Sequence, residues 1–283
     1  MTSGPALAVA AERLAPPAFA PGSVWLVGAG PGDPGLLTLH AAHALAVADV
    51  VLHDALVSPE ILLLAEGARL ECVGKRAARP SPSQMRINER MIRLARQGLR
   101  VVRLKGGDPL VFGRGGEEAL ALAAAAVPFR IVPGISAGVG GLAGAGIPLT
   151  HRSLGRSVVF ATGHDSRGKL PDGTDWAALA RGADVLVLYM ALGQAGAIAD
   201  RLIAAGRPAS EPLAFITNAT TSRQQVCIAT LGTAAAAAEQ IPRASATLIV
   251  VGPVVGLRAM LAPWQNATPM TPRTAERRAP AQA

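Results

Sequence analysis

Short runs rich in β-branched and aliphatic residues alternate with helical stretches through the first half of the chain. The pattern predicts strands at about residues 24–28, 50–53, 69–74, 100–105 and 129–132, and each of these runs is preceded or followed by a helical segment. Such alternation is typical of an α/β fold with a largely parallel sheet. We therefore expect residues 23–135 to form an α/β domain with a mostly parallel sheet.

The pattern changes after residue 150. Strands are predicted near residues 157–162, 184–189, 212–217, 224–229 and 247–252, with fewer helices between the last three. The link 220–223 is short, which indicates antiparallel pairing of the strands that flank it.

These two halves predict a two-domain protein. Residues 136–263 are expected to form a second α/β domain with a mixed sheet, and the Gly- and Pro-rich passage 133–156 marks the boundary. A cleft between two such halves is a usual place for a ligand. The ends, residues 1–22 and 264–283, have no periodicity and are expected to be mobile tails.

Composition supports a globular protein of enzyme size. Of 283 residues, 50% are apolar and 16% are charged, which supplies a buried core and argues against disorder or a fibrous repeat. Cys72 and Cys227 are far apart and lie in predicted strands, so neither a disulfide framework nor a metal cluster is expected. A reducing compartment is the simplest interpretation.

Targeting signals are weak. The apolar stretch 6–11 is about half the length of a good signal core, so we expect a cytoplasmic protein. Residues 131–150 carry no charge, but their six Gly and two Pro would make a poor bilayer helix. This segment is expected to form a loop, a buried Gly-rich helix and a second loop, without a membrane span.

The positive charge points to an anionic partner. The net charge of +8 arises mainly from 24 Arg against 3 Lys, and the Arg fork suits carboxylates and phosphates. At helical spacing Arg86, Arg90 and Arg93 fall on one face, which is most often a solvated face. Nucleic-acid contact is the alternative, but aromatics make up only 3% of the chain and none is interleaved with these residues. No nucleic-acid partner is expected.

Carboxylates follow three of the predicted parallel strands. Asp33, Asp54 and Asp108 come directly after the first, second and fourth strands, where open parallel sheets bind ligands. Helix capping and turn formation could explain any one of them. Together they favour a ligand with positive charge or ribose hydroxyls over a phosphate. S-adenosylmethionine has a sulfonium, an ammonium and a ribose, whereas a divalent metal is less favoured because no further ligands stand at regular spacing.

The glycine loop after the first strand departs from the dinucleotide-binding fingerprint. In the segment 28–34 the third Gly falls one position early, and Pro31 lacks the amide that a pyrophosphate would need.

Basic residues stand on both sides of the expected cleft. Arg114 lies in a Gly-hinged loop before a predicted helix, with Glu117 in its first turn, and Arg152 follows the Gly-rich segment. This arrangement would hold a cationic cofactor and an anionic substrate together. Surface ion pairing is the alternative for both Arg residues.

Several segments then match a known family. They are VWLVGAGPGDPGLLTL (24–39), DALV (54–57), VGKR (73–76), RLKGGDP (103–109), VFGRGGEE (111–118), VPGI (132–135), GIPLTHR (146–152), TGH (162–164), YM (189–190) and IVVG (249–252). Over residues 23–260 the chain thus resembles the uroporphyrinogen-III C-methyltransferases of the tetrapyrrole methylase family.

The resemblance implies a tetrapyrrole methylase fold, with two α/β domains around an active-site cleft, and usually a homodimer. It implies transfer of methyl groups from S-adenosylmethionine to C2 and C7 of uroporphyrinogen III, giving precorrin-2 by way of precorrin-1 and releasing S-adenosylhomocysteine. No metal is implied, and the product feeds cobalamin or sirohaem biosynthesis. A ribosomal RNA 2′-O-methyltransferase of the same fold and a non-catalytic adenosine-ligand sensor remain alternatives.

The resemblance also implies the roles of individual residues. The cofactor-binding residues would be Pro31, Gly32, Gly106, Gly107, Asp108, Val111, Ser136, Ala137, Met190, Ala219, Ala246 and Thr247. Substrate binding would involve Arg114, Arg152 and Met190, and the catalytic residues would be Asp54, Arg114 and Glu117. Either Asp54 or Glu117 could handle the proton.

Four positions depart from many relatives. Many relatives have Arg where this chain has Ala55, and Thr where it has Ser136. They have Pro-Ala where this chain has Ser245-Ala246, and Gly-Glu-Val-Val where it has Gly252-Pro253-Val254-Val255. The first change is expected to alter carboxylate contacts and the third to loosen the adenosine contact.

Overall fold

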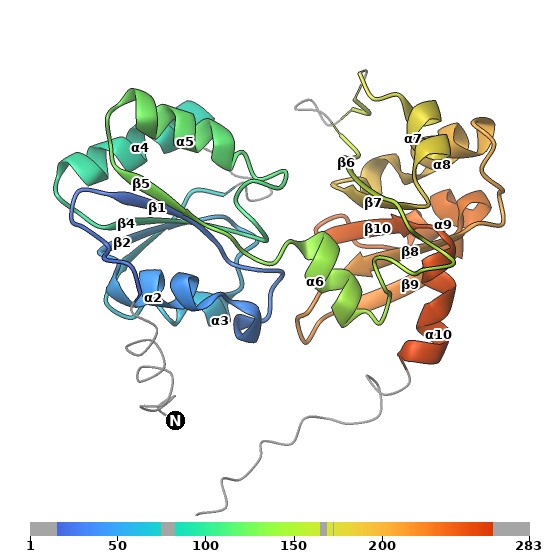
Figure 1. The fold of residues 1–283 in the computed structure, drawn as a ribbon, viewed down its shortest axis with the longest axis horizontal. Coiled ribbons are helices and arrows are strands. Elements are labelled where there is room, and N and C mark those ends of the chain that lie inside the picture. The colour runs from blue at the N-terminus through green and yellow to red at the C-terminus, as the bar shows by residue number, and fades with distance from the viewer. Residues whose placement is uncertain (1–15, 75–82, 165–168, 172, 263–283) are drawn as a thin grey trace, which may run out of the picture.

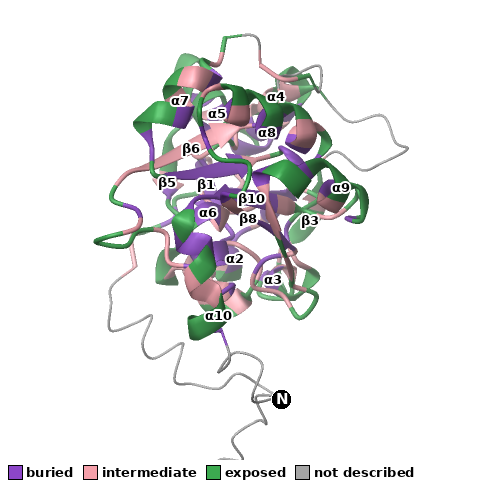
Figure 2. Cartoon of the chain, turned by 90° about the vertical axis from the view of Figure 1, so that its right-hand side faces the viewer, coloured by how far each residue is buried: buried purple, intermediate pink, exposed green. Residues whose placement is uncertain are grey.

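Two α/β units lie side by side and are joined between β5 and α6 in the computed structural model (Figure 1). The structure describes residues 16–74, 83–164, 169–171 and 173–262. Each unit contains a five-stranded sheet. Figure 2 shows the strands largely buried and the outer faces of the helices exposed.

The first sheet is entirely parallel. Its strands are β1 (Val24–Gly28), β2 (Val50–His53), β3 (Arg69–Cys72), β4 (Val101–Lys105) and β5 (Phe129–Val132). They lie in the order β3-β2-β4-β1-β5, and every neighbouring pair is parallel. The short apolar runs of the sequence predicted these strands because a parallel sheet is buried on both faces.

Helices cover both faces of this sheet. Apolar residues of α2 (Leu39–Val47) and α3 (Pro59–Leu62) pack on the face that carries Val51, Val102 and Leu104. On the opposite face α4 (Gln84–Arg96) and α5 (Gly115–Ala124) pack against Val50 and Val101. Parallel strands that end together bring the loops after β1, β2 and β4 to one edge of the sheet.

Glycines allow the loops after β1, β4 and β5 to meet. A Cβ placed on Gly28 would lie 2.5 Å from the amide nitrogen of Gly134 and 2.6 Å from the carbonyl oxygen of Gly107. Real Cβ atoms do not approach backbone so closely, so the strand ends come together only because these positions lack side chains.

The second sheet is mixed, as predicted. Its strands are β6 (Val158–Thr162), β7 (Val185–Tyr189), β8 (Pro212–Thr217), β9 (Gln225–Thr230) and β10 (Thr247–Val251), in the order β6-β7-β10-β8-β9. The β6–β7 pair is parallel and the other three pairs are antiparallel. The predicted antiparallel pairing across 220–223 is confirmed.

The second sheet is also covered on both faces. Its core on one side includes residues of α7 (Trp176–Gly182), α8 (Ala195–Ala204) and α9 (Ala234–Glu239), and on the other side those of α6 (Ala137–Gly144). The remaining elements are η1 (Pro34–Leu36), η2 (Leu192–Gln194), η3 (Leu231–Thr233), η4 (Pro253–Leu257) and α10 (Arg258–Leu261).

The uncharged segment 131–150 contains α6 between two loops, as the sequence predicted. Its helix has eight residues and packs on the second sheet. Across the described part of the chain, none of the helices combines the length and apolar character needed to cross a bilayer.

The prediction of a mobile N-terminal tail through residue 22 is wrong at its inner end. Phe19 is buried and its ring stacks on Trp25 at a centroid distance of 4.5 Å. The aromatic ring covers the start of β1 and belongs to the first core. Residues 1–15 and 263–283 lie outside the described residues.

Candidate active site

The carboxyl edge of the first sheet contacts the second unit. The amide of Asp33 donates to Thr220 Oγ1 at 3.1 Å, and the ring of Phe112 lies 4.9 Å from that of Tyr189. Tyr189 ends β7, and Thr220 follows the end of β8. Both lie at the edge of the second sheet where β10 begins. The predicted ligand site therefore falls at the junction of two sheet edges.

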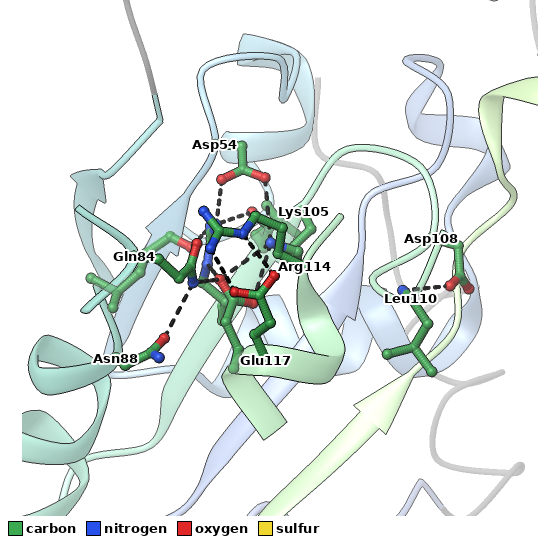
Figure 3. Close-up of polar contacts among 12 residues, drawn as sticks. Asp54, Gln84, Asn88, Lys105, Asp108, Leu110, Arg114 and Glu117 are labelled. Carbon is green, nitrogen blue, oxygen red and sulfur yellow. Dashed lines mark hydrogen bonds and ion pairs between the residues drawn. The ribbon is translucent and has the colours of Figure 1, made fainter. Parts of the chain in front are cut away.

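Two of the three strand-end carboxylates have turn-forming contacts. Asp33 Oδ1 accepts from the Gly35 amide at 2.7 Å. Asp108 accepts from the Leu110 amide at 2.8 Å and from Gly134 at 3.1 Å (Figure 3). Capping and turn formation, which the sequence left open, thus account for both side chains in the free protein.

Asp54 has a different environment. Its Oδ1 lies 2.5 Å from Arg103 Nη2, and its Oδ2 lies 3.8 Å from Lys105 Nζ. The carboxylate is 28% exposed, whereas the two cations beneath it are 3% and 2% exposed. Buried positive charge therefore lies directly below Asp54 and compensates its carboxylate in the free protein. Among the described residues, no group of three or more His, Cys, Asp or Glu side chains is arranged so that it could hold a metal ion.

A buried ion cluster extends from Asp54 into the first unit. Glu118 on α5 is 0% exposed and lies 2.9 Å from Arg103 Nε and 3.2 Å from Lys105 Nζ. Gln84 at the start of α4 donates to Glu118 Oε1 at 3.0 Å. Buried charges are tolerated when they are paired in this way.

The pKa values of the two buried cations shift in opposite directions. Burial lowers the pKa of Lys105, and the neighbouring Arg103 lowers it further. Burial also opposes the charge of Arg103, but Asp54 and Glu118 outweigh it and raise the pKa of the guanidinium. Both residues stand at alternate positions of the central strand β4, whose other residues are apolar. That alternation was the signal in the sequence that could have revealed the cluster.

Arg114 and Glu117 form an exposed pair above this cluster. Arg114 Nε lies 2.9 Å from Glu117 Oε1, Nη2 lies 2.5 Å from Oε2, and both side chains are more than half exposed. The hydrogen bond from Arg114 lowers the pKa of Glu117, and Lys105 contributes to the same shift. Figure 3 shows this pair grouped with Asp54 and Lys105, whereas Asp108 lies apart.

The Arg114–Glu117 pair is available to a ligand. Arg114 is the residue directly before α5, and its backbone has a left-handed φ of 62°. An exposed pair of this kind is worth about 0–1 kcal/mol, so an incoming carboxylate can take the place of Glu117.

Predicted cofactor residues converge at the start of α6. A Cβ on Gly107 would lie 3.6 Å from the Ala137 amide nitrogen and 3.8 Å from Ser136 Cα. The loop after β4 thus faces the first turn of α6 directly.

The loops after β1 and β8 reach the same helix. A Cβ on Gly140 would lie 3.0 Å from Pro31 Cγ, and one on Gly141 would lie 2.9 Å from Ala219 Cβ. A Cβ on Gly32 would likewise lie 2.9 Å from the carbonyl oxygen of Ala219, so these two loops also contact each other closely. Small residues on α6 therefore allow both loops to approach it.

The last predicted cofactor residues lie at the same edge of the second sheet. The Asn218 amide donates to the Ala246 carbonyl at 2.9 Å, and Thr247 pairs with Thr217 at the end of β8. Met190 follows β7 with a left-handed φ of 53°. Gly106 and Val111 lie on the loop between β4 and α5 with Asp108.

Tyr189 links these parts, although no separate role was predicted for it from the sequence. Its hydroxyl lies 2.6 Å from Ser136 Oγ and accepts from the Gly138 amide at 2.7 Å. Its ring also contacts Phe112 of the first unit. Tyr189 thereby fixes the first turn of α6 and connects it to the loop before α5.

Arg152 lies in a turn that follows α6. It is exposed, and the turn is closed by the bridge between His151 and Gly155. A Cβ on Gly155 would lie 2.8 Å from Val185 Cγ2, at the start of β7. The role of Arg152 in substrate binding stays a prediction.

Comparisons with known proteins agree with the family resemblance. The model for Tetrapyrrole (Corrin/Porphyrin) Methylases matches residues 23–235. A uroporphyrinogen-III C-methyltransferase of Sinorhizobium is 58% identical over 246 residues, which are 87% of this chain and 88% of the relative. Siroheme synthase 1 of Yersinia pseudotuberculosis is 50% identical over 88% of this chain, but the chain spans only 52% of that protein.

Solved structures show the same fold. A uroporphyrin-III C-methyltransferase of Thermus thermophilus, complexed with S-adenyl homocysteine, matches with a TM-score of 0.72 and 39% identity. The match covers 83% of this chain and 99% of that one. A second structure of the Thermus thermophilus enzyme has a TM-score of 0.72 and 45% identity, covering 85% of this chain and 98% of the other.

Proposed function

Because the chain belongs to the tetrapyrrole methylase family, we propose that it methylates uroporphyrinogen III at C2 and C7, with S-adenosylmethionine as the methyl donor. The product is precorrin-2, formed by way of precorrin-1. The observation that carries the proposal is the convergence of the family's motif residues on one junction, with Asp54 and Arg114 beside the loops that meet α6.

The residues at this junction fit an adenosine-containing cofactor. Gly107 has a left-handed φ of 69° and leaves open the space in front of the Ala137 amide, which a side chain would fill. The holding residues are Pro31, Gly32, Gly106, Gly107, Asp108, Val111, Ser136, Ala137, Met190, Ala219, Ala246 and Thr247. When bound, S-adenosylmethionine supplies a methyl group on a sulfonium and is released as S-adenosylhomocysteine.

Arg114 and nearby apolar side chains suit the substrate. Uroporphyrinogen carries eight carboxylates, and a guanidinium binds a carboxylate through two parallel hydrogen bonds. Arg114 already makes such a contact with Glu117, which a substrate carboxylate replaces. Phe112 and Met190 are 40% and 43% exposed and offer apolar surface to the macrocycle. Arg152 is the second predicted anion contact.

The protein's part in the reaction is alignment and proton handling. The pyrrole carbon is the nucleophile, and its new bond to the methyl carbon forms as the carbon–sulfur bond breaks, with the electron pair remaining on sulfur. The methylated ring then releases a proton. We assign its acceptance to Asp54, whose position is fixed by buried cations, whereas Glu117 orients Arg114 only until the substrate carboxylate replaces it.

A product assay under anaerobic conditions tests the activity. Incubation with S-adenosylmethionine and uroporphyrinogen III should give a dimethylated tetrapyrrole and two equivalents of S-adenosylhomocysteine. Methylated ribosomal RNA without a tetrapyrrole product would overturn the proposal. Cofactor binding without consumption would identify a sensor instead.

The Arg-rich helix gives the RNA alternative little support. On α4, Arg90 is engaged by Glu71 at 2.6 Å, and Arg86 and Arg93 are exposed. Single-stranded RNA binding usually adds stacked aromatics, and α4 contains none. A homodimer in the cytoplasm remains the expectation from the resemblance, and light scattering of the purified protein tests the dimer.

A further inference from the structure

We propose that the buried Arg103–Glu118 pair is the positioning device of the active site, which fixes the Asp54 carboxylate. The inference rests on the proposed function, in which Asp54 accepts the proton of the methylated ring. Arg103 and Glu118 touch neither ligand in this scheme and act through Asp54.

All three guanidinium nitrogens of Arg103 are engaged. Nε donates to Glu118 Oε1 at 2.9 Å, and Nη2 donates to Asp54 Oδ1 at 2.5 Å. Nη1 donates to the carbonyl oxygens of Leu52 and Leu104, each at 3.3 Å. The planar group cannot turn without breaking several of these bonds, so it holds the carboxylate in one place.

Glu118 makes this arrangement possible. Its side chain is fully buried, and without it Arg103 and Lys105 would share the interior with Asp54 as the one remaining anion of the cluster. Glu118 stands on the buried face of α5, one residue after Glu117 on the exposed face. The same helix therefore carries the substrate-facing pair and the counter-ion of the cluster.

Charged and titratable groups on three elements surround Asp54. On β4 the cations are Arg103 and Lys105, and on α5 the anion Glu118 lies below the self-neutralised pair of Arg114 and Glu117. On β2 the His53 ring nitrogen Nδ1 lies 3.1 Å from the Asp54 carbonyl oxygen. Lys75 and Arg76, which follow β3 in the sequence, lie outside the described residues.

Removing Arg103 and removing the charge of Glu118 should affect turnover to different degrees. Arg103→Met takes away the group that donates to Asp54 Oδ1 and leaves the carboxylate unheld, so kcat should fall by about tenfold or more. Glu118→Gln keeps an acceptor for Arg103 Nε, so the guanidinium should stay in place and kcat should fall by less. Neither residue contacts a ligand in this scheme, so KM and cofactor Kd should stay close to the wild-type values.

Arg100, which directly precedes β4, provides a control. Its Nε lies 4.0 Å from Asp49 Oδ2, and its amide donates to that oxygen at 2.7 Å, at the ends of β4 and β2 away from Asp54. Arg100→Met should leave kcat at its wild-type value. Arg103→Lys, which retains the charge but not the fork, should lower kcat severalfold, but by less than Arg103→Met.

The experiment combines kinetics with a substrate-free measurement. The kcat, KM and cofactor Kd of wild type, Arg103→Met, Glu118→Gln, Arg103→Lys and Arg100→Met are measured. In parallel, carboxyl-carbon NMR follows the Asp54 signal, assigned by its loss in Asp54→Asn. A fall in kcat that is largest in Arg103→Met, smaller in Arg103→Lys and smallest in Glu118→Gln, with KM and cofactor Kd within about threefold of wild type and a displaced or broadened Asp54 signal in Arg103→Met, supports the proposal.

An unchanged kcat in Arg103→Met, or a rise in KM and cofactor Kd as large as the fall in kcat, would overturn it. If Arg103→Met does not fold, Glu118→Gln and Arg103→Lys decide the question by the same measurements. Failure of the proposed function is recognised separately, because wild type would then yield no methylated tetrapyrrole while the NMR signal still reports on Asp54.

Discussion

Loss of one oxygen atom at Tyr189 should loosen the start of α6. In Tyr189→Phe the Ser136 hydroxyl loses a partner at 2.6 Å and the Gly138 amide loses its acceptor at 2.7 Å. Gly138 is buried, and a buried donor without a partner costs about 1–3 kcal/mol. We therefore expect Tyr189→Phe to reduce the free energy of unfolding by about 2 kcal/mol.

That loss should be visible in thermal unfolding and in cofactor binding. For a chain of this size about 2 kcal/mol corresponds to a fall in Tm of about 3–4 °C. The first turn of α6 carries Ser136 and Ala137, so the cofactor must reorder it on binding. We expect its Kd to rise about tenfold, which corresponds to about 1.4 kcal/mol.

Calorimetry and NMR measure both effects. Tyr189 is the chain's one tyrosine, so ring-labelled tyrosine gives signals from this residue alone, and they should shift when cofactor binds. Phe160→Leu is the control, because its ring lies 6.0 Å from that of Tyr189 but has no polar group. In a double-mutant cycle with Ser136→Ala, the two changes should be less than additive. An unchanged Tm together with an unchanged Kd would refute the reasoning.

Three further changes test other parts of the molecule. Arg114→Ala should raise KM for uroporphyrinogen III about 10- to 100-fold while cofactor Kd stays the same, since a charge-assisted hydrogen bond contributes about 1.5–3 kcal/mol; an equal loss of both would show that Arg114 has been misplaced. Asp108→Ala leaves the amides of Leu110 and Gly134 without their acceptor and should weaken cofactor binding more than substrate binding; an unchanged cofactor Kd in calorimetry would count against its role. The hydrogen bond from Arg90 lowers the pKa of Glu71, so its stabilisation is present at neutral pH and lost as pH falls through that lowered pKa. Chemical denaturation should therefore show Glu71→Gln less stable than wild type by about 1 kcal/mol or less at neutral pH, with a gap that closes in acid; a gap independent of pH would contradict this.

Most strands could be predicted from the sequence because each is a short apolar run bounded by Gly, Pro or polar residues. The predicted run 212–217 coincides with β8, and the run 69–74 extends two residues beyond β3. The mixed character of the second sheet followed from one short link between strands. Local pattern is sufficient for such features because they depend on neighbouring residues.

The buried charges could not be predicted in the same way. Arg103 and Lys105 were given no role from the sequence, and their pairing with Glu118 depends on how α5 packs across β4. The three strand-end carboxylates looked equivalent in sequence. Only the fold separates Asp54, which lies above two cations, from Asp108, which holds backbone amides.

The surroundings of Arg152 could not be predicted from its motif either. The motif follows the Gly-rich segment closely, which favoured a place at the same site as Arg114. Helix α6 begins beside Tyr189 and its last residue, Gly144, still lies against Thr220, whereas the turn at 151–155 contacts the start of β7. The path of the chain between these points depends on the packing of α6, which the motif does not contain.

The meeting of Gly28, Gly107 and Gly134 has a consequence for redesign of this protein. Any side chain at Gly28 would collide with main-chain atoms, so libraries that randomise these loops would be dominated by misfolded members. The side chains of Arg114 and Glu117 at the start of α5 are more than half exposed, whereas a Cβ on Gly115 between them would collide with the Pro109 carbonyl oxygen. Engineering toward other macrocycles should therefore diversify positions 114 and 117 and keep Gly115 and the three strand-end glycines constant.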